Sequence, residues 1–326
     1  MKNTRKISAF SGLAMSGAAA WALSCSLAMP AVAAQLSGDA RSAIPKDVQQ
    51  LIAVDYRAMQ DSTAAMDLKN RVLPPELKQL EEALKSSGLN ANHDVDELAF
   101  ASFRVSGVDG TRIVGVAQGQ FDVAAIKAKW LKQKVKYTKV RTNRVYPMGS
   151  SGQVVTFVNP TTMIFGSNEA VKSALDARDG VTPSLLNNST FMDSMQAVDS
   201  EAVWSVLDQE GTQYMMHSVL GQAAQVTDYD TVKKRLLGSR YTMNFSNGVK
   251  FNLAVVTPDA FTAGTMASLL NAAVLYKKMS GTDVEKQAVG NTTVKSNADN
   301  LEVSFSASDS QFASLLQSPL FQAVVR

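Results

Sequence analysis

The chain contains one cysteine, Cys25, so no disulfide can form within it. Cys25 lies in an N-terminal stretch that has the features of an export signal, and we expect that stretch to be removed. The remaining chain then has no disulfide, no thiolate nucleophile and no cysteine ligand for a metal ion. An exported chain without disulfides depends on a large hydrophobic core, and a length of 326 residues allows one.

The N-terminal stretch is typical of a signal peptide in its charge and in the size of its residues. Three basic residues lie within the first six positions, and residues 7–29 carry no charge. The small residues at 31–34 match the site that a signal peptidase accepts, with cleavage before Ala34 or Gln35. We therefore expect residues 1–34 to be a signal peptide and the mature protein to be periplasmic or secreted.

Two alternatives would keep the protein at a membrane. The uncharged stretch could span a bilayer without being cleaved, although Ser and Gly residues interrupt it. Alternatively, Cys25 could carry a lipid and tether a scaffold protein, but Leu23 lies two residues before the cysteine, where lipidation signals usually have it three residues before. Both alternatives stay open from the sequence.

The charge balance argues against a nucleic-acid partner. There are 32 basic and 29 acidic side chains, and three of the basic ones, Lys2, Arg5 and Lys6, lie in the expected signal peptide. The rest of the chain is therefore formally neutral and lacks the general positive field that attracts nucleic acid.

Apolar periodicity and turn residues predict alternating strands and helices. The expected strands are residues 51–54, 98–105, 112–120, 137–141, 144–148, 154–158, 162–165, 202–207, 240–245, 249–256, 287–296 and 301–305. The expected helices are residues 76–86, 123–134, 168–177, 214–220, 258–278 and 308–316. Thr257 is the expected cap of the long helix, with Pro258 at its first position.

Two hairpins suggest that the chain is built from two similar units. Turn residues at 107–110 and 246–248 each join two expected strands, and a helix follows each pair. We predict an α+β fold with largely antiparallel sheets, in two tandem units of β-α-β-β-α-β-β order at residues 35–180 and 181–326. The alternative is coincidence, because the two halves share negligible sequence identity.

Motifs for catalysis and cofactor binding are missing from the sequence. The two histidines, His93 and His217, are far apart along the chain, and no zinc, serine-nucleophile or nucleotide-binding motif occurs. We therefore expect no cofactor, no metal site and a protein that is not an enzyme. The alternative is a hydrolase whose two carboxylates come together only in the folded chain.

A run of basic residues is the strongest candidate for a binding site. Eight basic residues and no acidic residue lie between positions 127 and 144, and aromatic residues are interspersed. Such a segment can attract an anionic component of the cell envelope, such as a lipid, lipopolysaccharide or an acidic glycan. The residues that we expect to contact it are Lys127, Lys132, Lys136, Tyr137, Lys139, Arg141 and Arg144.

Two other interpretations of this segment stay open. The partner could be another envelope protein instead of a small anionic component. Alternatively, the segment could be a solvated helix face followed by an edge hairpin whose lysines prevent aggregation, with Trp130 buried in the core.

Three stretches resemble a known kind of protein. They are 44–45 with 51–55 (Ile-Pro and Leu-Ile-Ala-Val-Asp), 94–97 (Asp-Val-Asp-Glu) before a strand, and 165–176 (Phe-Gly-Ser-Asn-Glu-Ala-Val-Lys-Ser-Ala-Leu-Asp). Their order is similar to that in exported bacterial proteins of unknown function with duplicated α+β units. The resemblance implies an exported, duplicated protein that is not obviously an enzyme, and it supplies no catalytic residues.

Overall fold

The computed structural model describes residues 34–107, 110–150, 152–220 and 232–318. Residues 1–33 of the expected signal peptide (1–34), with Cys25, lie outside the described residues, as do Val108 and Asp109 of the first expected hairpin turn. Within the described part, twelve strands form one sheet, and every pair of neighbouring strands is antiparallel.

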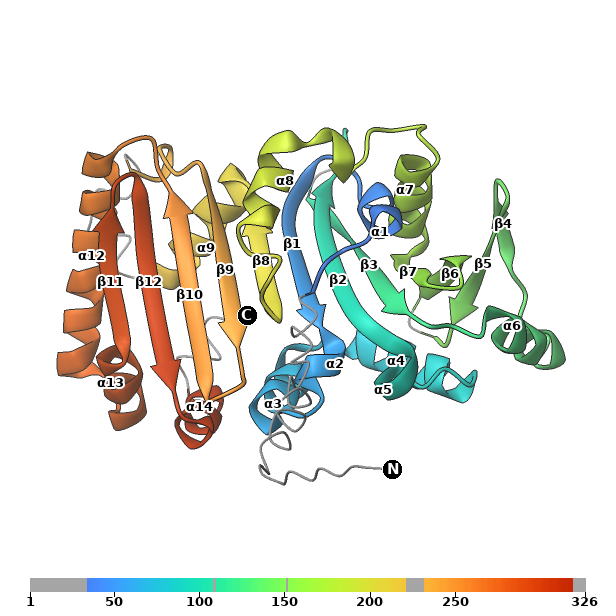
Figure 1. Cartoon of the computed structure of the whole chain (residues 1–326), viewed down its shortest axis with the longest axis horizontal. Helices are drawn as coiled ribbons and strands as arrows, with labels where there is room; N and C mark the ends of the chain where they lie inside the picture. The colour runs from blue at the N-terminus through green and yellow to red at the C-terminus, as the bar shows by residue number, and fades with distance from the viewer. Residues whose placement is uncertain (1–33, 108–109, 151, 221–231, 319–326) are drawn as a thin grey trace, which may run out of the picture. The chain divides into compact units, whose positions relative to one another are not determined.

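The strands follow one another in a single row across the sheet. In chain order they are β1 (Val48–Asp55), β2 (Val95–Arg104), β3 (Thr111–Gly119), β4 (Thr138–Val140), β5 (Asn143–Met148), β6 (Gln153–Asn159), β7 (Thr162–Ser167), β8 (Val203–Leu207), β9 (Gly238–Asn244), β10 (Val249–Val256), β11 (Thr292–Asn297) and β12 (Asn300–Ala307). Figure 1 shows their spatial order from left to right, β11-β12-β10-β9-β8-β1-β2-β3-β7-β6-β5-β4.

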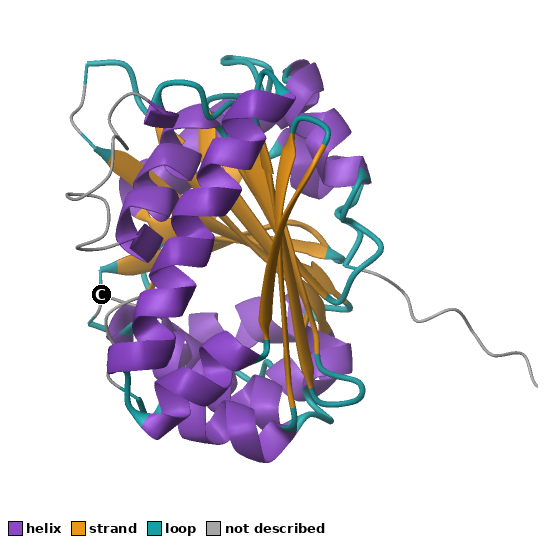
Figure 2. Cartoon of the chain, turned by 90° about the vertical axis from the view of Figure 1, so that its left-hand side faces the viewer, coloured by secondary structure: helices purple, strands orange, loops and turns teal. Residues whose placement is uncertain are grey.

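Helices connect the strands and pack on the sheet. They are α1 (Gly38–Ser42), α2 (Tyr56–Met59), α3 (Thr63–Val72), α4 (Pro75–Ser86), α5 (Ala91–Asp94), α6 (Val123–Lys132), α7 (Asn168–Arg178), α8 (Ser189–Gln196), α9 (Gln209–Leu220), α12 (Ala260–Ser280), α13 (Asp283–Gly290) and α14 (Asp309–Leu316). Figure 2 looks at the sheet from its β11 side and shows its twist, with helices packed against it. The combination of a large antiparallel sheet and packed helices confirms the predicted α+β class.

The sheet extends outward from two central neighbours, β1 and β8. On the β1 side the following strands are β2, β3, β7, β6, β5 and β4, and on the β8 side they are β9, β10, β12 and β11. Strands from both expected units therefore lie in one continuous sheet. The duplication itself and the unit boundary at residue 180 stay predictions.

One face of the central strands is buried in an apolar core. Leu51 and Ala53 of β1, Phe103 of β2 and Trp204 of β8 are each at most 1% exposed. The N-terminal segment with α1, together with α7 and α8, supplies the apolar side chains that cover this face. Successive strand residues point to opposite faces, so Leu98 and Phe100 of β2 pack against a second core on the other face.

The second core lies beside α4 and α6. Trp130 of α6 is 1% exposed, and its Nε1 donates a hydrogen bond to the Oγ of Ser87 at 2.7 Å. Its ring centroid lies 4.4 Å from that of Tyr146, and Phe157 belongs to the same cluster. Trp130 is therefore a core residue.

The predicted strand at 287–296 is wrong over its first part. Residues Asp283–Gly290 form α13, and β11 begins only at Thr292. The Thr282 side chain caps this helix, and the Glu285 carboxylate accepts the backbone N–H of Thr282 in return. This reciprocal capping box satisfies two backbone donors and determines where the helix starts.

The predicted cap of the long helix is also wrong. Asp259, not Thr257, caps α12, because the Asp259 Oδ1 accepts the backbone N–H of Thr262 at 2.8 Å. The hydroxyl of Thr257 instead donates to the carbonyl oxygen of Asp299 at 2.7 Å. A carboxylate near the helix N-terminus is also favoured by the helix dipole.

Candidate functional site

The basic segment lies at the β4 end of the sheet, in α6 and in the hairpin that follows it (Figure 1). The α6 helix carries Lys127, Lys129 and Lys132, the connection carries Lys134 and Lys136, and the β4–β5 hairpin carries Lys139, Arg141 and Arg144. Eight bases are thus distributed over consecutive elements next to an edge strand.

Seven of the eight bases form what we call the basic surface. They are Lys127, Lys129, Lys132, Lys134, Lys136, Lys139 and Arg144. Lys127 is half-buried and the other six residues are exposed. Within the described ranges, no ion pair involves any of the seven. Their positive charges are therefore available to a ligand.

Tyr137 provides an aromatic surface among these bases. Its side chain is 40% exposed, and the guanidinium carbon of Arg144 lies 4.8 Å from the centre of its ring. The ring of the buried Tyr146 supports it from below, with 5.5 Å between the two centroids. A guanidinium stacked on a ring retains donors that can bind phosphate or carboxylate oxygens.

Arg141 differs from the other bases because its charge is used within the fold. Its Nη1 donates to the Oδ2 of Asp179 at 2.8 Å and to the carbonyl oxygen of Leu175 at 3.3 Å, and its Nη2 contacts Asp176. Burial raises the pKa of Asp179, but hydrogen bonds from Arg178 and Arg141 outweigh that effect and leave the pKa below its usual value. Arg141 therefore joins the hairpin to α7 and is a poor candidate for contacting a ligand.

We expect Arg141→Asn to destabilise the fold by about 1–2 kcal/mol, because it removes hydrogen bonds to two carboxylates. Asn tolerates the positive φ of 53° at this turn position, so the backbone conformation is kept. Urea unfolding measures the change in the free energy of unfolding. Lys139→Asn is the matched control and should change that free energy by less than about 0.5 kcal/mol. Equal losses in both variants would contradict a structural role for Arg141.

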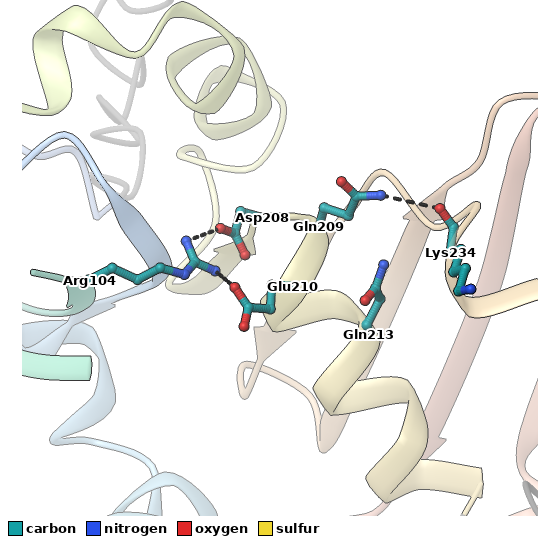
Figure 3. Close-up of a pocket in the computed structure, with 6 residues that line it drawn as sticks. All are labelled: Arg104, Asp208, Gln209, Glu210, Gln213 and Lys234. Atoms are coloured by element: carbon teal, nitrogen blue, oxygen red, sulfur yellow. Dashed lines mark hydrogen bonds and ion pairs between the residues drawn. The ribbon is translucent and has the colours of Figure 1, made fainter. Parts of the chain in front are cut away.

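A polar hollow of about 500 Å³ lies where β2 and β8 end and α9 begins (Figure 3). The Nη1 of Arg104 lies 2.6 Å from the Oδ2 of Asp208, and its Nη2 lies 2.7 Å from the Oε2 of Glu210. The hydrogen bond to Asp208 raises the pKa of Arg104 further. Gln213 and Lys234 complete the charged and polar rim. Because the Arg104 charge is already matched by two carboxylates, the hollow has no excess charge of one sign to attract an ion.

A second hollow, of about 580 Å³, lies beside the loop that follows α7. It is lined by Lys46, Ala177, Gly180, Val181, Thr182, Pro183, Ser184 and Asn187. Neither hollow includes any residue of the basic surface. The basic surface is thus separate from both hollows.

Two buried carboxylates, Asp55 and Glu97, lie directly opposite each other in the β1–β2 ladder. They are 9% and 8% exposed. Burial, and next the negative charge of Asp55, raises the pKa of Glu97 to about 7, although a hydrogen bond from the backbone N–H of Gln35 acts in the other direction. Burial is also the main cause that raises the pKa of Asp55. Neither carboxylate lines either hollow.

Among the described residues, no group of three His, Cys, Asp or Glu side chains is placed to bind a metal ion. His93 is exposed, and its Nδ1 lies 2.8 Å from the Oδ1 of Asp94. No helix among these residues combines the length and apolar character needed to cross a bilayer.

Comparison with known proteins gives a likeness in fold alone. No family model matches the chain, and no curated protein matches it. Three crystal forms of TP0453 resemble it. Crystal form III has a TM-score of 0.49 and 10% sequence identity, over 85% of this chain and 96% of that chain. Crystal form I has a TM-score of 0.47 and 9% identity, over 87% of this chain and 96% of that chain.

Sequence reasoning missed the carboxylate pair and the bridging role of Arg104. A partial signal for the pair is present, because Asp55 ends one apolar strand and Glu97 begins the next. Which residues face each other depends on the strand register, which the sequence does not specify here. The partners of Arg104, Asp208 and Glu210, lie in the other half of the chain, so no local pattern reveals them.

Proposed function

We propose that this protein is exported and that it binds a polyanionic component of the cell envelope, without catalysis, on the basic surface. The observation that supports this most strongly is the set of seven cations that have no acidic partner among the described residues. The expected mature chain is neutral as a whole, so these charges produce a local positive field. At physiological salt that field extends about 8–10 Å into the solvent.

An extended ligand suits this site better than a small molecule. The basic residues are spread over α6, the connection after it and an edge hairpin, and they line neither hollow. A ligand with repeated phosphate or carboxylate groups can contact several of them at once, and each contact adds to the affinity. The Tyr137 ring with Arg144 on its face adds an aromatic contact near the centre of the set.

The test is binding of the exported, purified chain to vesicles of anionic phospholipid, to lipopolysaccharide and to an acidic glycan, each in low and high salt. We expect binding that weakens with salt, because exposed charges are screened. Replacing Lys127, Lys132, Lys136 and Lys139 by Ser should lower the affinity about 100-fold or more, at about 1 kcal/mol for each lysine near a charged surface. The arm that binds identifies the ligand class.

The control variant removes the same amount of charge elsewhere. It replaces four exposed lysines of the second half by Ser: Lys250, Lys278, Lys286 and Lys295. This variant should keep nearly all of the affinity. Equal losses in the two variants would mean that only net charge matters, and absence of binding to all three ligands at low salt would overturn the proposal.

A further inference from the structure

The first described residues cross the buried face of the central strands. The Nε1 of Trp204 donates to the carbonyl oxygen of Ala34 at 2.9 Å. The side chain of Gln118 donates to the carbonyl oxygen of Gln35 at 3.2 Å and accepts the backbone N–H of Ser37 at 2.6 Å. Ala34 itself is fully buried. The segment in which we expect signal-peptide cleavage is therefore held on the sheet.

Glu97 lies under this segment in a row of polar residues. The strand registers place Asp55 of β1 opposite Glu97 of β2, and Glu97 opposite Gln118 of β3. The amide of Gln118 donates both to the Glu97 carboxylate and to the carbonyl oxygen of Gln35, so Gln35 and Glu97 share one partner. The segment that we expect to begin the mature chain therefore lies next to the carboxylate pair.

A counter-charge for this pair is missing from the described residues. No Lys or Arg side chain among them forms an ion pair with Asp55 or Glu97. Arg57, whose charge acts on Asp55, is ion-paired with Asp96 instead. Two carboxylates buried side by side are unfavourable unless a cation or a proton compensates them.

We propose that the α-amino group created by removal of the signal peptide supplies this cation, and that it forms an ion pair with Glu97. Cleavage before Gln35 places the amine on the residue whose carbonyl oxygen shares the Gln118 amide with the Glu97 carboxylate. Cleavage before Ala34 places it one residue further, about 3.5 Å along the backbone. An ammonium group has three donors, and charge-assisted hydrogen bonds are stronger than neutral ones. The inference depends on the signal-peptide removal that the proposed export requires.

The pH dependence follows from the signs of the two titrations. Without an amine nearby, Glu97 has a pKa of about 7, so stability decreases as pH rises through neutrality and the buried carboxyl ionises. An ammonium group at this position lowers the pKa of Glu97, and the carboxylate raises the pKa of the amine above its usual value of about 8. The ion pair therefore stabilises the fold at pH values between the pKa of Glu97 and the pKa of the amine. The other charged groups whose fields reach the pair are Asp55, Asp96 and Arg57.

The experiment uses the full chain, exported and processed by the cell. One variant carries Gly-Ser inserted directly after the cleavage site that mass spectrometry finds, so that cleavage at the same site leaves the new amine two residues further from Glu97. We expect this insertion to lower the melting temperature at pH 7 by about 3 °C or more. In the Glu97→Gln background the insertion should have no effect, whereas in the control background Glu82→Gln, at an exposed carboxylate of α4, it should have its full effect.

Mass spectrometry of the processed chain determines which outcome applies. A chain that begins at Ala34 or Gln35, together with the Glu97-dependent effect of the insertion, supports the proposal. Equal effects in the Glu97 and Glu97→Gln backgrounds would overturn it, and so would a chain that begins at Cys25. Neither result affects vesicle binding by the basic surface. Absence of that binding would overturn the proposed function but not the ion pair.

The reactivity of the amine gives a second readout that does not depend on stability. The processed chain is treated with a small amount of an acylating reagent near pH 7, and modification of the N-terminal amine is followed by mass spectrometry. A paired, buried amine should react about tenfold more slowly than the same amine in Glu97→Gln. Equal rates would overturn the ion pair even if the variants differ in stability.

Discussion

Trp204→Ala is expected to reduce the free energy of unfolding by about 3–5 kcal/mol. Trp204 is fully buried on β8, one of the two central strands, and its Nε1 donates to the carbonyl oxygen of Ala34. Its removal leaves a large cavity and, in a chain cleaved before Ala34, an unsatisfied carbonyl group as well. Since most domains are stable by only about 5–15 kcal/mol, the variant should lose a large part of its total stability. Urea unfolding followed by fluorescence or circular dichroism measures the loss.

The control for this variant truncates an exposed aromatic side chain. Tyr214 of α9 is 76% exposed, and Tyr214→Ala should change stability by less than about 0.5 kcal/mol. Trp204→Phe retains most of the apolar volume but leaves a smaller ring and, in a chain cleaved before Ala34, removes the hydrogen bond to Ala34, so its loss should lie between those of the two alanine variants. A loss below about 1 kcal/mol for Trp204→Ala would contradict a central core position.

Gly115→Ala is the second substitution for which we expect a large effect. Gly115 of β3 lies opposite Phe165 of β7, and a Cβ atom at Gly115 would overlap the Cε2 and Cζ atoms of that ring. Phe165 is 5% exposed and packs edge-on against Phe100, with 5.8 Å between their centroids, so the ring has little room to move. Overpacking of this kind costs about 1–3 kcal/mol, which thermal or urea unfolding detects.

Two further variants test whether the ring is the cause. In the Phe165→Leu background the added methyl group has more space, so Gly115→Ala should cost at least about 1 kcal/mol less than it does alone. A Cβ atom at Gly264 of α12 would have no neighbouring atom within 4 Å, so Gly264→Ala should be neutral or stabilising by up to about 1 kcal/mol. Destabilisation by both Gly→Ala changes to the same extent would contradict the overlap with Phe165.

Local patterns predicted much of the secondary structure. The β9–β10 hairpin follows from the Asn-Gly turn at 247–248 between two apolar runs, and the structure has both strands. The error at 287–296 arose because a short apolar run does not distinguish a strand from a helix. The decisive signal was Thr282 followed three residues later by Glu285, which is the pattern of a capping box.

The order of the strands and the pairing of the buried charges could not be predicted from local patterns, because both depend on contacts between segments that are far apart in the sequence. The antiparallel class follows from the hairpins, but the pairing of β1 with β8 joins segments that no local turn connects. The basic segment was visible because its residues are consecutive. Asp55 and Glu97 face each other only through the strand register, and Arg141 differs from its neighbours only because α7 folds back beside it.

The pairing of β1 with β8 also has a consequence for the order of folding. Ile52 pairs with Phe100 on one side and with Ser205 on the other, so one edge of β1 can be completed long before the other. Closing the larger loop costs more chain entropy, and contacts between distant segments slow folding. We therefore expect the β1–β2–β3 meander to form first and to expose the backbone edge of β1 until β8 arrives. During that interval the chain is most vulnerable to pairing with other unfinished copies of itself.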